Sequence, residues 1–346
     1  MLITILGITV TFGIVVLFHE LGHFMAAKGM GVRVEKFSMG FGPEWFGFTK
    51  GKTRYKVCLF PLGGYVKMYG EDPGEGTKGE PDEYLSQKWW KKMIIVCSGS
   101  LMNFVLAVLI FTFLMSVVGV SVPDVRPVVG SVAPSSPADT GGIKEGDVIL
   151  SVGGEDISTW NQMADIIHAN PGKKLKIVIL RGTERLKKEI VPAYDKNGKI
   201  GLIGIVTRME RKRYGIFYSL VESVKSVTAL CYLILHSLWL MITGKLPPDI
   251  AGPVGIAQII GKVTKTGWLE LANFIGVISV NLGLFNLFPI PLVDGGHILT
   301  IGIEAIRGKS LPPEKIKIIQ NIGILIILAI FIFATYQDMI RLFVKK

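Results

Sequence analysis

Long stretches without formal charge limit what this chain can fold into. A helix needs about 20 mostly apolar residues to cross the hydrocarbon core of a membrane. Candidate spans of this kind are Leu2 to about Ala27, Met93–Val122, Leu271–Val293 and Ile318–Gln337. Hydrophobic residues make up 49% of the 346 residues and charged residues only 19%, which is too apolar for a soluble protein. We therefore expect a polytopic α-helical membrane protein with four transmembrane helices.

The first span ends in the motif His19-Glu20-Leu21-Gly22-His23, after a run with no charge between Leu2 and Phe18. Histidines four residues apart lie on one face of a helix, where both imidazoles can reach one metal ion. Glu20 is placed to act as general base on a metal-bound water. A carboxylate in hydrocarbon costs about 2.5 to 3.5 kcal/mol on insertion scales, which favours a functional role. The motif predicts a zinc peptidase that works inside the membrane.

A third metal ligand is needed, because catalytic zinc usually takes three protein ligands and a water. The third span ends in a segment that contains Asn286, two prolines, Asp294 and His297. The prolines stop the helix and free backbone groups, and the carboxylate follows at once. We expect Asp294 to be the third ligand. His297 is the alternative ligand, or a residue that only donates a hydrogen bond near the metal.

The segment between the first two spans is rich in glycine, aromatic residues and alternating apolar residues. Three stretches in it are typical of short strands joined by glycine turns, namely 37–43, 55–60 and 61–68. Backbone of this kind at membrane depth must be buried in protein or line a cavity. We therefore expect a membrane-embedded β-sheet.

From about Pro123 to Tyr194 the composition becomes that of a soluble domain. Short β-branched strands alternate there with two short helical patterns, which predicts one small α+β domain. The expected division of the chain is 1–122 for the first two transmembrane helices with the sheet, 123–195 for the inserted domain, 196–268 for a linker with an amphipathic membrane-surface helix, and 269–346 for transmembrane helices three and four.

The direction of the spans follows from the need to bring His19, His23 and Asp294 to one ion. Each lies toward the C-terminal end of its span, so the first and third spans must run in the same direction. The number of further crossings between Val122 and Leu271 is then even. Ser226–Gly244 also lacks formal charge, but it cannot cross alone, and we interpret it as an amphipathic helix on the membrane surface.

Basic residues in the loops predict the orientation, because short cytoplasmic loops carry an excess of Lys and Arg. Those that flank the spans on one side are Lys28, Arg33, Lys36, Lys50, Lys52, Arg54, Lys56, Lys88, Lys91, Lys92, Arg307, Lys309, Lys315 and Lys317. Arg341, Lys345 and Lys346 lie on the other side and are outnumbered. We expect a multi-pass protein of the cytoplasmic (inner) membrane, with the active site toward the cytoplasm and the inserted domain outside. The net charge of +11 then reflects cytoplasmic loops and not nucleic-acid binding.

Together these motifs resemble the bacterial site-2 protease family, most closely its RseP type. The resemblance rests on the HExxH motif in the first span, the Gly-Phe-Gly-Pro and Pro-Leu-Gly-Gly-Tyr-Val loops, the inserted domain and the pattern Asn-x-x-Pro-x-Pro-Leu-x-Asp-Gly-Gly. Val293 stands where the family usually has Leu before the aspartate, an apolar exchange that keeps the ligand position. The resemblance covers nearly the whole chain.

The resemblance implies a Zn²⁺ cofactor held by His19, His23 and Asp294, with Glu20 activating water. It also implies transmembrane protein substrates that have been trimmed outside the membrane, such as anti-sigma factors or remnant signal peptides. Asn103 and Asn286 would contact the substrate backbone or its oxyanion. For both asparagines, hydrogen bonding between helices is the alternative.

The inserted domain resembles a single PDZ domain. Val129-Gly130-Ser131-Val132 would form its carboxylate-binding loop and edge strand and capture a peptide C-terminus by β-augmentation. Alternatively the domain is a steric filter that keeps bulky ectodomains away from the active site, and we favour the filter slightly.

Two other functions compete with the protease. A catalytically silent membrane adaptor would bind C-termini through the PDZ domain, but such a protein has no need for a buried carboxylate at Glu20. A metal transporter would need a second polar relay, which the spans do not contain.

Overall fold

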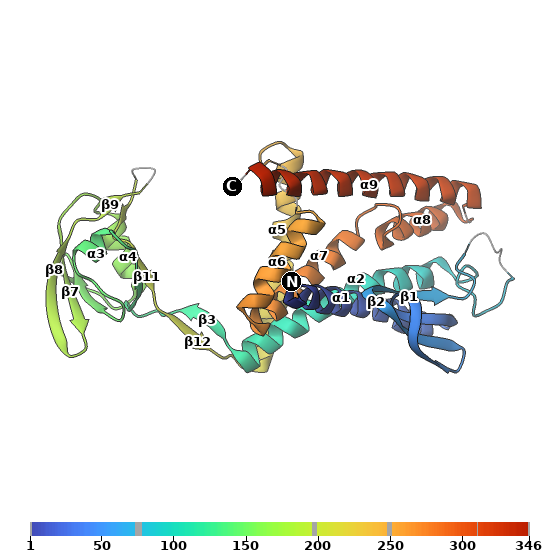
Figure 1. The fold of residues 1–346 in the computed structure, drawn as a ribbon, viewed down its shortest axis with the longest axis horizontal. Coiled ribbons are helices and arrows are strands. Elements are labelled where there is room, and N and C mark those ends of the chain that lie inside the picture. The colour runs from blue at the N-terminus through green and yellow to red at the C-terminus, as the bar shows by residue number, and fades with distance from the viewer. Residues whose placement is uncertain (1, 73–77, 196–198, 248–250, 310, 345–346) are drawn as a thin grey trace. The chain divides into compact units, whose positions relative to one another are not determined.

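A computed structural model describes residues 2–72, 78–195, 199–247, 251–309 and 311–344. The chain forms two compact units. One unit combines the segments Met1–Leu114 and Gly215–Lys346, and we call it the helical unit. The other unit is Met115–Tyr214, and we call it the inserted domain (Figure 1).

The helical unit consists of seven described helices and one β-hairpin. Its helices are α1 (Leu2–Gly29), α2 (Trp89–Phe113), α5 (Ile216–Ile242), α6 (Pro253–Thr266), α7 (Trp268–Asn286), α8 (Asp294–Arg307) and α9 (Pro313–Val344). A π-helical turn, Leu114–Val118, continues α2 toward the inserted domain. As expected from the prolines, α7 ends before Pro289 and a new helix starts at Asp294.

Five helices among the described residues are long and apolar enough to cross a membrane, one more than the sequence predicts. They are α1, the α2 region Trp89–Val118, α5, α7 and the Glu314–Phe343 part of α9. Of these, α5 buries the smallest share of its residues in the protein. In Figure 1, α5 runs at a steep angle to α1 and α2, whereas those two helices lie along each other.

The hairpin consists of β1 (Val34–Lys50) and β2 (Thr53–Met68). Both strands bend, and residues 36–39 pair on one side with residues 64–67 and on the other with residues 54–57. Residues 44–50 pair with residues 53–58. The hairpin therefore forms a sheet of four stretches. The stretch 64–68 lies at one edge of this sheet. Among the described residues, it is paired with β1 on one side and with no strand on the other.

The inserted domain is built around an antiparallel four-stranded sheet. The sheet has the order β6-β5-β7-β8, and the helix α4 packs on it. The domain's elements are β3 (Val120–Pro123), β4 (Val129–Val132), α3 (Pro137–Thr140), β5 (Val148–Val152), β6 (Glu155–Asp156), α4 (Trp160–His168), β7 (Leu175–Arg181), β8 (Glu184–Ile190), β9 (Ala193–Tyr194), β10 (Gly201–Leu202), β11 (Ile205–Thr207) and β12 (Met209–Lys212). Ile149, Ile177 and Ile179 are fully buried in its apolar core.

The domain begins earlier and ends later than the predicted range 123–195. The reason is that two short strands after Tyr194 return to its start: β11 pairs with β4, and β12 pairs with β3. The predicted linker 196–268 is correspondingly divided between the two units, because α5 and α6 belong to the helical unit. Pairing of β3 with β12 brings the two ends of the insertion together, which is what an insertion into a helical unit requires.

The segment predicted as a ligand-binding edge strand forms β4. One side of β4 is paired with β11. The N–H of Val129 donates a hydrogen bond to the carbonyl of Asp147, and the Val129 side chain is fully buried. This part of the predicted carboxylate loop therefore has no free N–H to offer a peptide C-terminus.

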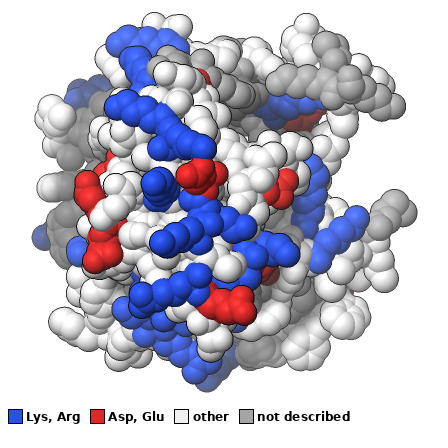
Figure 2. All heavy atoms as spheres, turned by 90° about the vertical axis from the view of Figure 1, so that its left-hand side faces the viewer, with Lys and Arg blue, Asp and Glu red and all other residues white. Residues whose placement is uncertain are grey.

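Basic side chains are spread over the outer surface of the inserted domain (Figure 2). On β7 and β8, the exposed ones include Lys176, Arg185 and Lys187. Since β8 lies at the edge of the four-stranded sheet, its charges discourage edge-to-edge pairing with another chain. Acidic residues are interspersed among them, so the surface is of mixed charge.

A buried carboxylate ties together two parts of the inserted domain. Asp147 is 1% exposed and accepts hydrogen bonds from Nε and Nη2 of Arg181, both at 2.8 Å, and from the N–H of Lys144 at 2.8 Å. Burial alone would raise the pKa of Asp147, but the hydrogen bonds from Arg181 and Lys144 outweigh it, and the pKa is lowered.

We expect Arg181→Ala to lower the unfolding free energy of the inserted domain by about 3 kcal/mol, because Asp147 would stay buried without its cation. Urea denaturation of the 115–214 fragment measures this. Because folding lowers the pKa of Asp147, the stabilisation is present above about pH 4 and is lost as the pH falls below it. An equal difference between parent and variant at pH 7 and pH 2.5 would contradict this account.

Candidate metal centre

Two imidazoles meet in the C-terminal half of α1. His19 and His23 are one helical turn apart, and their Nε2 atoms lie 3.2 Å from each other. Their rings stand almost perpendicular, with an interplanar angle of 88°. Both side chains are largely buried, so their facing nitrogens are shielded from bulk water.

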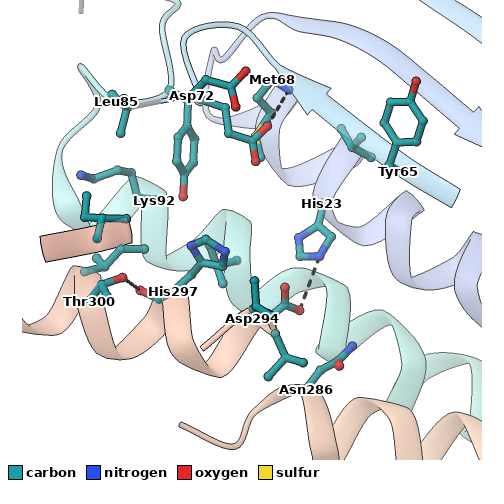
Figure 3. A pocket seen from close by; sticks show the side chains of 18 of the residues that line it. His23, Tyr65, Met68, Asp72, Leu85, Lys92, Asn286, Asp294, His297 and Thr300 are labelled. Atoms are coloured by element: carbon teal, nitrogen blue, oxygen red, sulfur yellow. Dashed lines mark hydrogen bonds and ion pairs between the residues drawn. The ribbon is translucent and has the colours of Figure 1, made fainter. Parts of the chain in front are cut away.

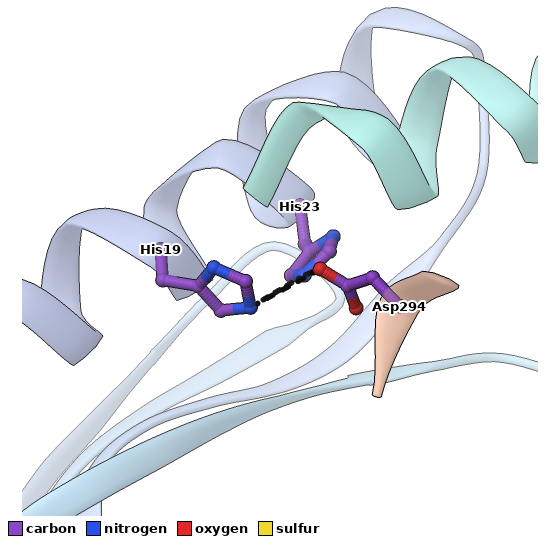
Figure 4. A group of neighbouring side chains, drawn as sticks. All are labelled: His19, His23 and Asp294. Atoms are coloured by element: carbon purple, nitrogen blue, oxygen red, sulfur yellow. Dashed lines mark hydrogen bonds and ion pairs between the residues drawn. The ribbon is translucent and has the colours of Figure 1, made fainter. Parts of the chain in front are cut away.

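A carboxylate from the far end of the sequence completes the group. Oδ2 of Asp294 lies 3.4 Å from Nε2 of His19 and 3.5 Å from Nε2 of His23 (Figure 4). This oxygen is buried and has no hydrogen-bond partner in the part of the chain that the structure describes. Since a buried carboxylate oxygen without a partner is costly, the atom is suited to a ligand.

Asp294 reaches the imidazoles because the chain turns tightly between α7 and α8. Leu292 adopts a positive φ of 83° in this turn. A Cβ atom on Gly295 would lie 1.9 Å from the carbonyl oxygen of Phe288, and one on Gly296 would lie 2.6 Å from that of Ile290. The two glycines after the aspartate are therefore required by close backbone packing, and they fix the start of α8.

The three donor atoms fit a zinc ion. Zinc bonds to nitrogen and oxygen of about 2.0–2.1 Å in a tetrahedral arrangement separate neighbouring ligand atoms by roughly 3.3 Å. The observed separations are 3.2, 3.4 and 3.5 Å. Among the described residues, this is the one group of three such side chains with ligand atoms within 4.8 Å of one another. His297 is not part of it, so the geometry favours Asp294 over the alternative ligand.

The helix α2 backs the two imidazoles closely. Nδ1 of His23 donates a hydrogen bond to the carbonyl of Ile95 at 2.9 Å, which leaves the lone pair of Nε2 directed at the centre. A Cβ atom on Gly99 would lie 2.3 Å from Nε2 of His23 and 2.8 Å from Cε1 of His19. One on Gly22 would lie 2.2 Å from the carbonyl oxygen of Ser98. Small residues on both helices thus permit the contact.

Glu20 faces a cavity beside the imidazoles. The cavity has a volume of about 530 Å³ and is lined by residues of α1, β2, α2, α7, α8 and α9. Figure 3 shows His23, Tyr65, Asp294 and His297 around it. Glu20 packs against the edge of the sheet, where a Cβ atom on Gly64 would lie 3.3 Å from its Cγ.

The two predicted substrate-contacting asparagines occupy different positions. Asn286 lines the cavity, with Nδ2 at 3.3 Å from Nε2 of His19. Asn103 does not line the cavity and is fully buried, with Nδ2 at 3.3 Å from Nδ1 of His19. Both were expected to contact the substrate, but of the two only Asn286 lines the cavity that a substrate can enter.

An ion pair in the same cavity was not predicted from the sequence. Nζ of Lys92 on α2 lies 3.1 Å from Oε2 of Glu304 on α8, and both side chains are largely buried. Oε1 of Glu304 also accepts a hydrogen bond from the N–H of Leu311. The pair fastens α8, whose first residue is Asp294, to the helix that backs the imidazoles. From the sequence, Lys92 is expected only to be one of the basic residues that flank a span.

Helices of membrane-spanning length that bring an HExxH motif and a carboxylate together define a membrane-bound metallopeptidase class. The model of Peptidase family M50 matches residues 7–330, and the chain belongs to this family.

Relatives that this chain matches over nearly their whole length are named as proteases. The zinc metalloprotease RasP of Oceanobacillus iheyensis is 30% identical, with 98% of this chain and 99% of that protein covered. The regulator of sigma-W protease RasP of Bacillus subtilis is 29% identical, with 98% and 99% covered. A crystal structure of the PDZ domain of the SdrC-like protein of Listeria monocytogenes matches 25% of this chain and 93% of that chain, at 29% identity and a TM-score of 0.22.

We expect Gly99→Ala to lower the affinity for zinc by roughly tenfold or more, the usual scale for disturbing groups that hold metal ligands. The added methyl group would overlap both imidazoles and displace them. Competition with a chromophoric chelator measures the affinity. Gly302→Ala is the matched control, because a Cβ atom there has no neighbour within 4 Å. Parent-like affinity in Gly99→Ala would show that α2 does not confine the imidazoles.

Proposed function

We propose that this protein is a zinc-dependent intramembrane endopeptidase of the site-2 type. The observation that carries the proposal is the convergence of Nε2 of His19, Nε2 of His23 and Oδ2 of Asp294, within 3.5 Å of one another and shielded from bulk water. His19, His23 and Asp294 would hold the ion. When bound, zinc supplies Lewis acidity, which makes water more acidic and polarises the scissile carbonyl.

Glu20 is the proposed general base. It follows His19 directly and lines the same cavity, so its carboxylate is positioned to take a proton from the attacking water. It then returns the proton to the leaving amine of the cleaved peptide.

The cavity supports hydrolysis at membrane depth, which needs a supply of water. Its wall includes polar and charged side chains from five helices, among them Lys92, Thr300 and Glu304. These groups can hold water next to the imidazoles, whereas the lipid-facing sides of the helices cannot. The alternative of a silent adaptor leaves both the cavity and the Glu20 carboxylate without a use.

The substrate is proposed to bind as an added strand. A transmembrane helix hides its carbonyls in internal hydrogen bonds, so it must unwind before cleavage. The edge stretch 64–68 of β2 has one paired side and contributes Tyr65, Val66 and Met68 to the cavity wall. An extended segment paired with this edge would run past Glu20. Asn286, near His19, is placed to donate to the substrate carbonyl or its oxyanion.

We propose that four helices cross the membrane, namely α1, α2, α7 and α9, and that α5 lies along its surface. The steep angle between α5 and α1 supports this arrangement (Figure 1). It also keeps α1 and α7 parallel, as the shared metal site requires. By the distribution of basic residues, the metal centre faces the cytoplasm of the inner membrane and the inserted domain lies outside.

The proposed substrates are single-span proteins already trimmed outside the membrane, such as anti-sigma factors or remnant signal peptides. The family membership and the name of the Bacillus subtilis relative, regulator of sigma-W protease, support this class. The inserted domain is proposed to be a PDZ domain that acts as a size filter. Its buried Val129 N–H favours the filter over capture of a C-terminus at β4.

We expect Glu20→Gln to cleave a transmembrane substrate about 10²–10⁴-fold more slowly than the parent in reconstituted vesicles, because the base is removed. The glutamine is nearly isosteric, and the three ligands stay in place, so the zinc content should not change. Equal cleavage rates for parent and variant would rule out Glu20 as the base. Cleavage by the parent that persists after removal of zinc with a chelator would rule out the metallopeptidase itself.

A further inference from the structure

Asn103 lies behind the metal centre and not in the cavity. It is on α2, one turn after Gly99, and no part of it is exposed. Its Nδ2 atom is 3.3 Å from Nδ1 of His19. Its backbone carbonyl accepts a hydrogen bond from Oγ of Ser279 on α7 at 2.8 Å. The residue is therefore enclosed by three helices and touches the ring atom of His19 that faces away from Asp294.

The protonation pattern of His19 follows from its place in the centre. Nε2 of His19 faces Nε2 of His23 and Oδ2 of Asp294. To bind a metal ion, Nε2 must carry a lone pair, so in the neutral imidazole the proton is on Nδ1. The groups around Nδ1 must then accept a hydrogen bond, and an amide nitrogen cannot do so.

The amide of Asn103 resolves this conflict when its oxygen and nitrogen exchange places. With Nδ2 toward the ring, Oδ1 of Asn103 is buried without a hydrogen-bond partner among the described residues. The two amide orientations are nearly identical in shape and are told apart by the hydrogen bonds that each makes. In the exchanged orientation Oδ1 accepts the proton of Nδ1, so a buried acceptor gains a partner and a donor-to-donor contact disappears.

One face of α2 then provides a hydrogen-bond acceptor for each of the two imidazoles. The carbonyl of Ile95 accepts from Nδ1 of His23, and Asn103 stands eight residues later on the same helical face, with Gly99 between them. Among the described residues, the side-chain oxygen of Asn103 has no other hydrogen-bond partner.

We propose that Asn103 is a positioning residue: its side-chain carbonyl accepts the Nδ1 proton of His19 and holds Nε2 toward the metal. This replaces the substrate contact expected for Asn103 from the family resemblance. The inference rests on the proposed metal site, but it is independent of how the substrate binds. It separates the two asparagines, because Asn286 lines the cavity whereas Asn103 lies behind the ligand.

The test compares Asn103→Asp with Asn103→Leu and Asn103→Ala in the full-length protein in detergent. A carboxylate can accept from Nδ1 but cannot donate, so Asn103→Asp should keep the zinc dissociation constant within about threefold of the parent or tighten it. Asn103→Leu and Asn103→Ala should weaken zinc binding roughly tenfold or more. Chelator competition gives these constants, and the visible spectrum of the Co²⁺-loaded forms should change in the two deletion variants only.

Ser279→Ala is the matched control, because it removes a buried hydrogen bond to the Asn103 backbone without touching His19. We expect it to bind zinc like the parent. Thermal unfolding of the metal-free proteins identifies any variant that fails to fold, and Asn103→Ala serves if Asn103→Leu fails.

Two results would overturn the proposal. Parent-like zinc binding in a folded deletion variant would show that His19 does not need the acceptor. Equal loss in folded Asn103→Asp would show that Asn103 acts as a donor, as a substrate contact would. Absence of stoichiometric zinc in the parent would overturn the metal site itself, which distinguishes that failure from the failure of the positioning role.

Discussion

Two imidazoles and a carboxylate buried among apolar helices are stable together only if they share a partner. His19, His23 and Asp294 carry ring nitrogens and an oxygen that face one another at 3.2–3.5 Å, and the oxygen has no other described partner. Without a cation, such a group concentrates unpaired lone pairs in a low-dielectric place. The rest of the helical unit holds these atoms close together. The need to hold them explains the close helix packing and the tight turn after α7, which the stability of the fold alone does not require.

Close helix packing supplies the geometry. Gly22 and Gly99 let α1 and α2 approach until a single added Cβ would collide with a backbone carbonyl or with an imidazole. The turn after α7 is equally tight at Gly295, and the buried pair of Lys92 and Glu304 holds α8 against α2. The cavity and the β2 stretch 64–68 lie beside the ligands, whereas Gly99 and Asn103 of α2 back the imidazoles and are not part of the cavity lining.

The sequence indicated that His19, His23 and Asp294 lie close together, but it did not indicate the other long-range contacts around them. Histidine spacing defines a helical face, and the prolines before Asp294 end a helix. Both chain segments that carry the candidate ligands could therefore be recognised from the sequence. The extent of the inserted domain was underestimated, because β11 and β12 have three and four residues and carry no periodic signal. The partner of Lys92 and the buried position of Asn103 depend on how helices rotate against one another, which apolar composition does not specify. The number of crossings was not evident either, since hydropathy cannot separate α5 from a span.

The zinc content of Asp294→Ala and His297→Ala tests the central claim most directly. Both side chains line the cavity. Of the two, only Asp294 has a possible ligand atom within 4.8 Å of ring nitrogens of both His19 and His23. The account predicts about one zinc ion per chain in purified parent protein and in His297→Ala, and strongly reduced zinc in Asp294→Ala, because a catalytic site needs three protein ligands. Full zinc occupancy in Asp294→Ala together with its loss in His297→Ala would contradict it.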